Sequence, residues 1–265
     1  MSDVNKRPLS RSVFTEHSLE SEILEEGRTY WLYLPPSYGE NFDESYPVLY
    51  LLDAENHFAP LTGILDFMSA KHGGDRIPEA IVIGVPNTDR TRDLTPTHTL
   101  IGEEGREETY LKHSGGGQAF LQFVRRELFE DVEARYRASD HRVLIGHSFG
   151  GILTLYAFLN EPHMFRSYIA ADPSFWWDNQ VLTRQLDVIS KPLSGSAYIS
   201  LANISGNGLS NAKAVGRMGR VFTKKLESIK PPALSYKWQY FEHENHLSVP
   251  LLSWYHGLLH TFESI

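Results

Sequence analysis

The chain has 265 residues, of which 41% are hydrophobic and 22% are charged, a composition typical of a globular protein in water. Its formal net charge of −8 argues against general nucleic-acid binding, which needs a basic surface, so no nucleic-acid partner is expected. The sequence has no cysteine, which excludes disulfides, thiolate metal ligands and a cysteine nucleophile.

The length of the chain fits one α/β unit, because such folds often run to about 250 residues as a single domain. We therefore expect one domain over residues 1–265. No stretch approaches the roughly 20 apolar residues of a membrane span, and residues 1–14 lack the apolar run of a signal peptide. These features predict a cytoplasmic protein without membrane contact.

Strand-like and helix-like segments alternate along the chain. Two neighbouring strands between residues 17 and 34 are predicted to be antiparallel, and further strands are predicted over 47–52, 80–85, 141–145, 167–171, 197–202 and 235–241. Apolar residues at helical spacing predict helices over 118–136, 150–159, 211–229 and 248–262. The alternation indicates an α/β fold: a mostly parallel sheet of about eight strands with helices on both faces and no large lid domain.

The segment VLIGHSFGG, residues 143–151, matches the pattern G-x-S-x-G at Gly146, Ser148 and Gly150, between an apolar strand and an apolar helix. The glycines leave room for a sharp bend, and the serine hydroxyl then projects at the carboxyl end of the sheet, where α/β proteins bind ligands. We predict that Ser148 is a nucleophile and that the N–H of Phe149 helps to stabilise an oxyanion. The alternative is an ordinary serine that caps the helix. His147 is interpreted as a packing residue.

A serine hydroxyl needs a base to take its proton. Two histidines follow the last predicted strand, and His246 is favoured because it lies directly before the final helix, with His243 as the alternative. The same pair at i, i+3 could belong to a metal site, but no third ligand is evident, so no metal is expected.

The acid that orients the histidine is harder to find. In this type of fold it lies between the serine and the histidine in the chain, usually after the strand predicted over 197–202, but that loop has no carboxylate. Three hypotheses remain: Asp172 at the end of the preceding strand, the side-chain carbonyl of Asn203, or a serine–histidine pair without an acid. Asp172 is preferred, although a carboxylate there could also cap a turn.

A second oxyanion donor is expected from the loop after the strand over 47–52, as the N–H of Ala54 or Glu55, with Asp53 holding that loop. Trp176 and Trp177 follow Asp172 and are predicted to line the substrate pocket, or else to pack under the loops.

Two arginines follow the strand over 80–85, again at the carboxyl end of the sheet. Arg92 is taken as the candidate contact to substrate. The alternative is that Arg90 and Arg92 pair with the neighbouring carboxylates Asp89 and Asp93.

Several stretches between Tyr46 and Pro250 together resemble the putative esterase family of α/β-hydrolases: YPVLYLLDAENHF, IVIGVPNTDRTRDLTP, GGGQAFLQFVRRELFEDVEARY, RVLIGHSFGG, DPSFWWDN and ENHLSVP. That family includes enterochelin and other siderophore esterases, S-formylglutathione hydrolase (esterase D) and mycolyltransferases. The resemblance implies that Ser148 is the nucleophile, that His246 is the base and that the Asp53 loop borders the oxyanion. Many members carry a carboxylate where this chain has Asn203, and some siderophore esterases work with a serine–histidine dyad.

The residues and the resemblance together predict a serine esterase that cleaves a small-molecule ester through an acyl-serine, with no cofactor. A thioesterase or acyltransferase would use the same serine chemistry and differ only in its pocket and acceptor. A hydrolase fold used for binding without catalysis is the alternative of another class.

Overall fold

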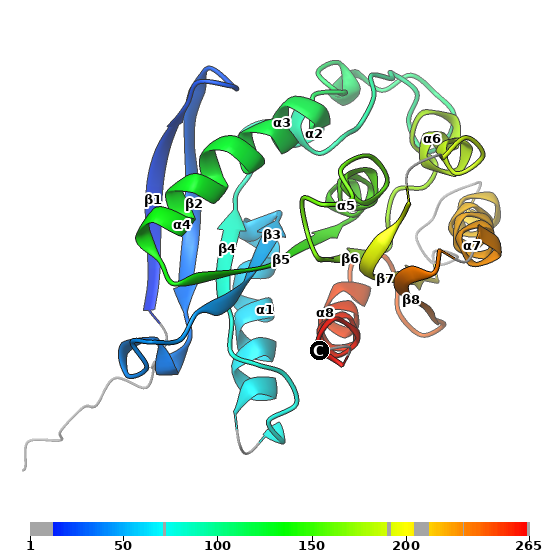
Figure 1. Cartoon of the computed structure of the whole chain (residues 1–265). Helices are drawn as coiled ribbons and strands as arrows, with labels where there is room; N and C mark the ends of the chain where they lie inside the picture. Colours follow the sequence, from blue (N-terminus) through cyan, green and yellow to red (C-terminus); the bar gives the residue numbers. More distant parts are fainter. Residues whose placement is uncertain (1–12, 71–72, 190–191, 204–211, 230, 264–265) are drawn as a thin grey trace, which may run out of the picture.

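The strands form one eight-stranded sheet in the order β1-β2-β4-β3-β5-β6-β7-β8 (Figure 1). The computed structural model of the protein describes residues 13–70, 73–189, 192–203, 212–229 and 231–263. β2 pairs antiparallel with both β1 and β4, and all other neighbouring strands are parallel. The bounds are β1 (Val13–Ser21), β2 (Glu26–Leu34), β3 (Tyr46–Leu52), β4 (Ile81–Val85), β5 (Ala138–His147), β6 (Ser167–Ala171), β7 (Ser194–Ala202) and β8 (Ala233–Phe241).

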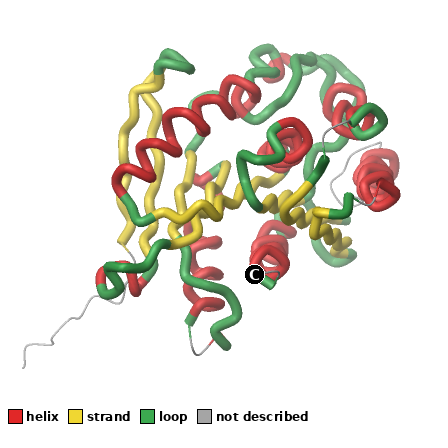
Figure 2. Tube along the Cα trace, in the orientation of Figure 1, coloured by secondary structure: helices red, strands yellow, loops and turns green. Residues whose placement is uncertain are grey.

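Helices cover both faces of the sheet (Figures 1 and 2). α1 and α8 pack on one face, and α3 to α7 lie on the other. None of the helices in the described part of the chain is long and apolar enough to cross a bilayer. The bounds are α1 (Ala54–Ser69), α2 (Arg90–Asp93), α3 (Gly117–Phe123), α4 (Phe129–Arg135), α5 (Phe149–Asn160), α6 (Trp177–Gln185), α7 (Ala212–Ile229) and α8 (Val249–Phe262), with a π-helical segment η4 (Val124–Leu128) between α3 and α4 and short 3-10 turns η1 (Pro36–Gly39) and η3 (Thr109–Leu111).

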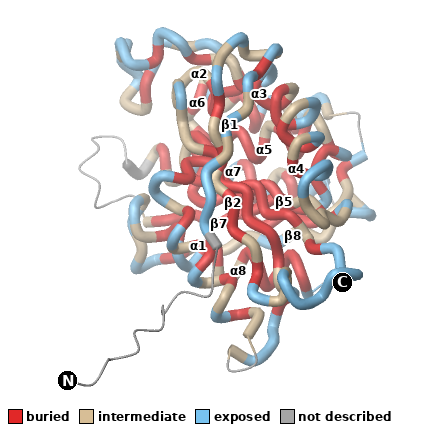
Figure 3. Tube along the Cα trace, turned by 90° about the vertical axis from the view of Figure 1, so that its left-hand side faces the viewer, coloured by how far each residue is buried: buried red, intermediate tan, exposed pale blue. Residues whose placement is uncertain are grey.

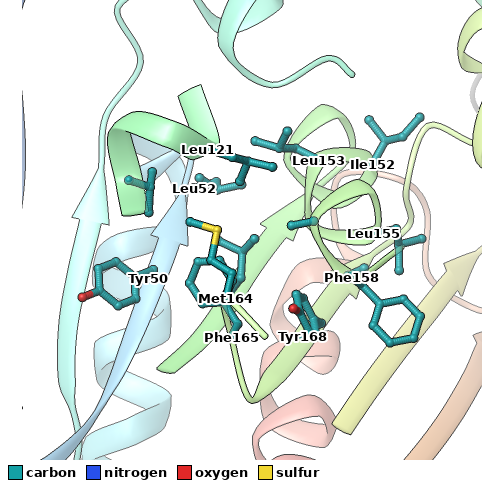
Figure 4. Close-up of a cluster of buried hydrophobic side chains, with 14 of the residues drawn as sticks. Tyr50, Leu52, Leu121, Ile152, Leu153, Leu155, Phe158, Met164, Phe165 and Tyr168 are labelled. Carbon is teal, nitrogen blue, oxygen red and sulfur yellow. The ribbon is translucent and has the colours of Figure 1, made fainter. Parts of the chain in front are cut away.

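The central strands are buried on both faces, as Figure 3 shows by the concentration of buried residues in the middle of the molecule. This burial explains their continuous apolar runs, because a parallel strand between two helical layers has no solvent-facing side. On the α5 side the core includes the cluster in Figure 4, with Tyr50, Leu52, Leu153, Phe158 and Phe165. The closely packed sheet is a rigid base for whatever its strand ends carry.

The α/β-hydrolase fold predicted from the sequence is confirmed, and the strand predicted over 167–171 has those bounds in the structure. The prediction that Ala54 and Glu55 lie in a loop is wrong, because α1 begins at Ala54. Pro60 and Gly63 within this helix conceal its periodicity, since both residues disfavour helix. The short helix α6 was also not predicted; it begins with left-handed residues at Asp178 to Gln180.

Candidate active site

The turn between β5 and α5 holds Ser148 at a positive φ, with φ 57° and ψ −113°. A Cβ on Gly146 would overlap the carbonyl group of Gly150 and lie 2.7 Å from Oγ1 of Thr154, so the strand and helix approach too closely for any side chain there. The N–H of Ser148 donates to the carbonyl of Ala171 at 3.1 Å. The serine is therefore fixed at the carboxyl end of the sheet, between β5 and β6.

His246 lies between Ser148 and Asp172. Its Nε2 is 3.0 Å from Ser148 Oγ, and its Nδ1 is 2.7 Å from Asp172 Oδ2. A carboxylate can only accept, so Nδ1 carries the proton and Nε2 is left as the acceptor for the serine hydroxyl. The other oxygen of Asp172 accepts from the backbone N–H of Ala202 at 2.9 Å, which orients the carboxylate toward the imidazole. The three residues form a serine–histidine–aspartate arrangement.

The structure also locates the alternatives considered for the base and the acid. His243 is exposed and does not line the cavity beside Ser148. Asn203 donates from its backbone N–H and its Nδ2 to the carbonyls of Glu244 and Glu242, at 2.8 and 3.0 Å. Asn203 thus ties the end of β7 to the loop that carries His246, whereas Asp172 contacts the ring itself.

A cavity of about 270 Å³ opens beside Ser148. Trp176 lines it, as predicted, but Trp177 does not. Trp177 is fully buried, with its Nε1 donating to the carbonyl of Thr97 at 3.2 Å. The lining residues are Arg90, Glu103, Tyr110, Ser148, Phe149, Asp172, Pro173, Ser174, Phe175, Trp176, Leu201, Ala202, Val215, Gly216, Gly219 and His246.

The two arginines of α2 have different surroundings, and the one taken as a substrate contact is not in the cavity wall. Arg92 bonds to Glu26 and Asp93 in a partly buried ionic network. Arg90 lines the cavity instead, and its Nε and Nη2 contact the two carboxylate oxygens of Asp53 at 2.6 and 3.0 Å. Residues two apart on a helix point in nearly opposite directions, which explains why only one of them reaches the site.

Two helices begin beside Ser148. Phe149 is the first residue of α5 and Ala54 is the first residue of α1, so both N–H groups belong to helix first turns, which have no intrahelical acceptor. Helix N-termini also carry partial positive charge. The Asp53 carboxylate lies against Gly150, and Arg90 both neutralises that carboxylate and stacks 5.0 Å over the Phe149 ring. Arg90 therefore braces the two segments together.

Glu103 and Tyr110 were not predicted as site residues, and they reach the cavity from the long segment between β4 and α3. Glu103 lies in a tight hairpin closed by the pairing of Ile101 with Glu107. Burial raises the pKa of the Glu103 carboxyl, nearby His246 opposes the rise, and the Asp172 charge adds to it. The fold topology could have pointed to these two residues, because segments that leave the carboxyl ends of parallel strands border the ligand site.

Comparison with known proteins gives the family of the chain. A family model described as "Putative esterase" matches residues 21–202. The chain belongs to this family. It is similar to the ferri-bacillibactin esterase BesA of Bacillus subtilis, at 25% identity over 84% of this chain and 81% of that one. A siderophore enterobactin esterase of Emericella nidulans is 31% identical over 62% of this chain and 57% of its own length.

Among solved structures, an IroE-like serine hydrolase from Shewanella oneidensis superposes with a TM-score of 0.87 at 33% identity, covering 95% of this chain and 80% of that one. A siderophore hydrolase from Aspergillus nidulans superposes with a TM-score of 0.79 at 21% identity, and this similarity supports the fold alone. The family predicted from the sequence is therefore confirmed, and so is the predicted class of reaction, the hydrolysis of carboxylic esters.

The close approach at Gly146 makes a prediction about stability. We expect Gly146→Ala to lower the free energy of unfolding by about 2–4 kcal/mol, because the methyl group forces β5 and α5 apart. Gly63→Ala in α1 is the matched control: nothing lies within 4 Å of its added Cβ, and the change should stabilise the helix by about 0.5–1 kcal/mol. Urea unfolding measures both. Equal effects of the two substitutions would contradict this description of the turn.

Proposed function

We propose that this protein is a serine esterase that hydrolyses a small-molecule siderophore ester through an acyl-enzyme on Ser148. The observation that supports the mechanism most is the pair of hydrogen bonds at His246, 3.0 Å to Ser148 Oγ and 2.7 Å to Asp172 Oδ2. Both are hydrogen-bond distances, and the first allows a proton to pass from Ser148 Oγ to His246 Nε2. The substrate class is proposed from the relatives, two of which are named siderophore esterases.

In the first half of the reaction, Ser148 Oγ bonds to the acyl carbon and its proton passes to His246 Nε2. The carbonyl oxygen becomes an oxyanion, which accepts from the N–H groups of Phe149 and Ala54. The bond from the acyl carbon to the alcohol oxygen then breaks, and His246 gives its proton to that oxygen. Each such N–H donor is worth about 3 kcal/mol of transition-state stabilisation.

In the second half, a water molecule attacks the acyl-serine while His246 Nε2 takes one of its protons. The bond to Ser148 Oγ breaks and the serine recovers its proton from His246. One water is consumed, and one acid and one alcohol are released. Asp172 keeps the imidazole in the required tautomer throughout and stabilises the imidazolium that forms twice in each cycle.

Aromatic side chains in part of the cavity wall support an acyl or alcohol part with a flat face. Trp176 and Phe175 contribute aromatic walls, with Leu201 and Val215 beside them. Tyr110 stands at the exposed side of the cavity. This lining gives room for a small ester.

Loss of the serine hydroxyl should abolish hydrolysis. We expect the wild type to release acid and alcohol from siderophore lactones and from p-nitrophenyl esters, and Ser148→Ala to lose this activity by at least about a thousandfold. Ser228→Ala is the matched control and should keep wild-type activity, because this exposed serine of α7 is outside the cavity wall and its hydroxyl donates to the carbonyl of Lys225 at 2.7 Å. Chromatography with mass detection measures the products.

Acyl-coenzyme A belongs in the same substrate panel, because a thioesterase would use the same serine. Activity of the Ser148→Ala variant equal to that of the wild type would contradict the mechanism. Cleavage of the thioester alone, with every oxygen ester left intact, would contradict the proposed substrate class.

The role of Asp172 predicts a separate effect. Replacing it by asparagine removes the carboxylate that accepts from Nδ1 and favours the wrong tautomer, so Asp172→Asn should lower kcat by about 10³–10⁴-fold. Asp178→Asn, further along the same segment, should leave kcat unchanged. Steady-state kinetics on a p-nitrophenyl ester measures both; a kcat for Asp172→Asn within a few-fold of the wild type would favour a serine–histidine dyad instead.

A further inference from the structure

Three imidazoles pack together beneath the reactive serine, and only one of them is the base. The His147 and His246 rings are 4.5 Å apart, and the His57 ring stands perpendicular to the His147 ring at 5.4 Å. Trp254 of α8 packs against the far side of His57 at 5.5 Å. His147 is the last residue of β5 and is directly followed by the nucleophile.

His147 was interpreted from the sequence as a packing residue, but its ring also makes a hydrogen bond. Its Nε2 is 2.8 Å from the backbone carbonyl oxygen of His246. That oxygen can only accept, so Nε2 of His147 carries a proton and donates it. Burial, together with the adjacent His246 and His57, lowers the pKa of His147 to about 2, although the hydrogen bond to the His246 carbonyl opposes the shift, so the ring is a neutral donor at physiological pH.

This bond acts on the segment that carries the base. Residues 242–248 join β8 to α8 without regular structure, and such a connection is less rigid than the sheet it leaves. Within this segment, Asn245 Oδ1 accepts from the N–H groups of Leu247 and Ser248, which shapes the turn locally. The bond from His147 is different, because it joins the main chain of His246 to the end of a buried central strand.

The adjacent residues His147 and Ser148 thus contact two different groups of His246, its backbone carbonyl and its ring. Ser148 Oγ contacts the His246 ring at 3.0 Å, and His147 Nε2 contacts the His246 carbonyl at 2.8 Å. A movement of the 242–248 segment as a body away from the end of β5 would lengthen both distances. A clamp of this kind fixes the separation on which proton transfer depends.

We propose that His147 is a positioning residue, whose neutral ring holds the backbone of His246 at the reactive distance from Ser148. The inference rests on the proposed serine mechanism and adds a further residue to it. His147 does not touch the substrate cavity, so its loss should change turnover and leave substrate binding almost unaltered.

Three substitutions separate the hydrogen bond from the packing. Glutamine can place an N–H near the position of Nε2, asparagine is too short to do so, and phenylalanine fills the space without a donor. With a p-nitrophenyl ester we expect kcat to fall by about 10–100-fold in His147→Asn and His147→Phe, with KM within about twofold, and to return to within about threefold of wild type in His147→Gln.

His260→Phe is the matched control. His260 is also buried, and its Nε2 lies 3.3 Å from the backbone carbonyl of Ser235, remote from the cavity. Its replacement should lower the thermal midpoint while leaving kcat unchanged. A downfield proton resonance from the His246 Nδ1–H bonded to Asp172 should be retained in His147→Gln and broadened in His147→Asn.

The rate of labelling by a fluorophosphonate distinguishes failure of this inference from failure of the mechanism beneath it. A wild type that does not react at Ser148 would overturn the proposed function. A reactive wild type with His147→Asn and His147→Phe equally fast would overturn the positioning role alone. Equal loss of kcat in all three His147 variants would also overturn it, because shape and not the donated hydrogen bond would then be responsible.

Discussion

The close contact between β5 and α5 is the constraint on which the rest of the site depends. No side chain fits at Gly146, because its Cβ position is taken by the Gly150 carbonyl group and Thr154. The chain can make this approach only by turning sharply at Ser148, where φ is 57°. This turn directs the serine hydroxyl outward and starts a new helix at the next residue. Under the proposed mechanism, the nucleophile and one oxyanion donor therefore come from the same turn.

The same solution recurs at two other strand ends around the cavity. Asp53 after β3 and Asp172 after β6 also have positive φ, of 54° and 38°. Such conformations are costly for residues other than glycine and persist only where the surrounding structure imposes them. Here the hydrogen bonds of the two carboxylates offset part of the conformational free energy. Asp53 bonds to Arg90, and Asp172 bonds to Ala202 and His246. The closely packed core holds all three turns at one edge of the sheet.

The sheet could be predicted from the sequence because buried parallel strands leave continuous apolar runs. Ser148 could be predicted as the nucleophile because the pattern G-x-S-x-G lies between an apolar strand and an apolar helix. Asp172 could be proposed from its place at a strand end, but only the fold brings it to His246. Adjacent tryptophans cannot be told apart by pattern, so Trp176 and Trp177 were both assigned to the pocket. For Arg90 and Arg92, two residues apart, the choice depended on the rotation of a short helix.

The most direct test of the account is the crystal structure of the protein after phosphonylation by a fluorophosphonate, whose tetrahedral phosphorus mimics the intermediate. From the proposed serine mechanism we expect a covalent bond from Ser148 Oγ to phosphorus, with one phosphonyl oxygen about 2.7–3.1 Å from the N–H groups of Phe149 and Ala54. His246 Nε2 should lie within hydrogen-bond distance of the remaining oxygen substituent. A bond to another residue, or a phosphonyl oxygen directed away from both helix N-termini, would contradict it.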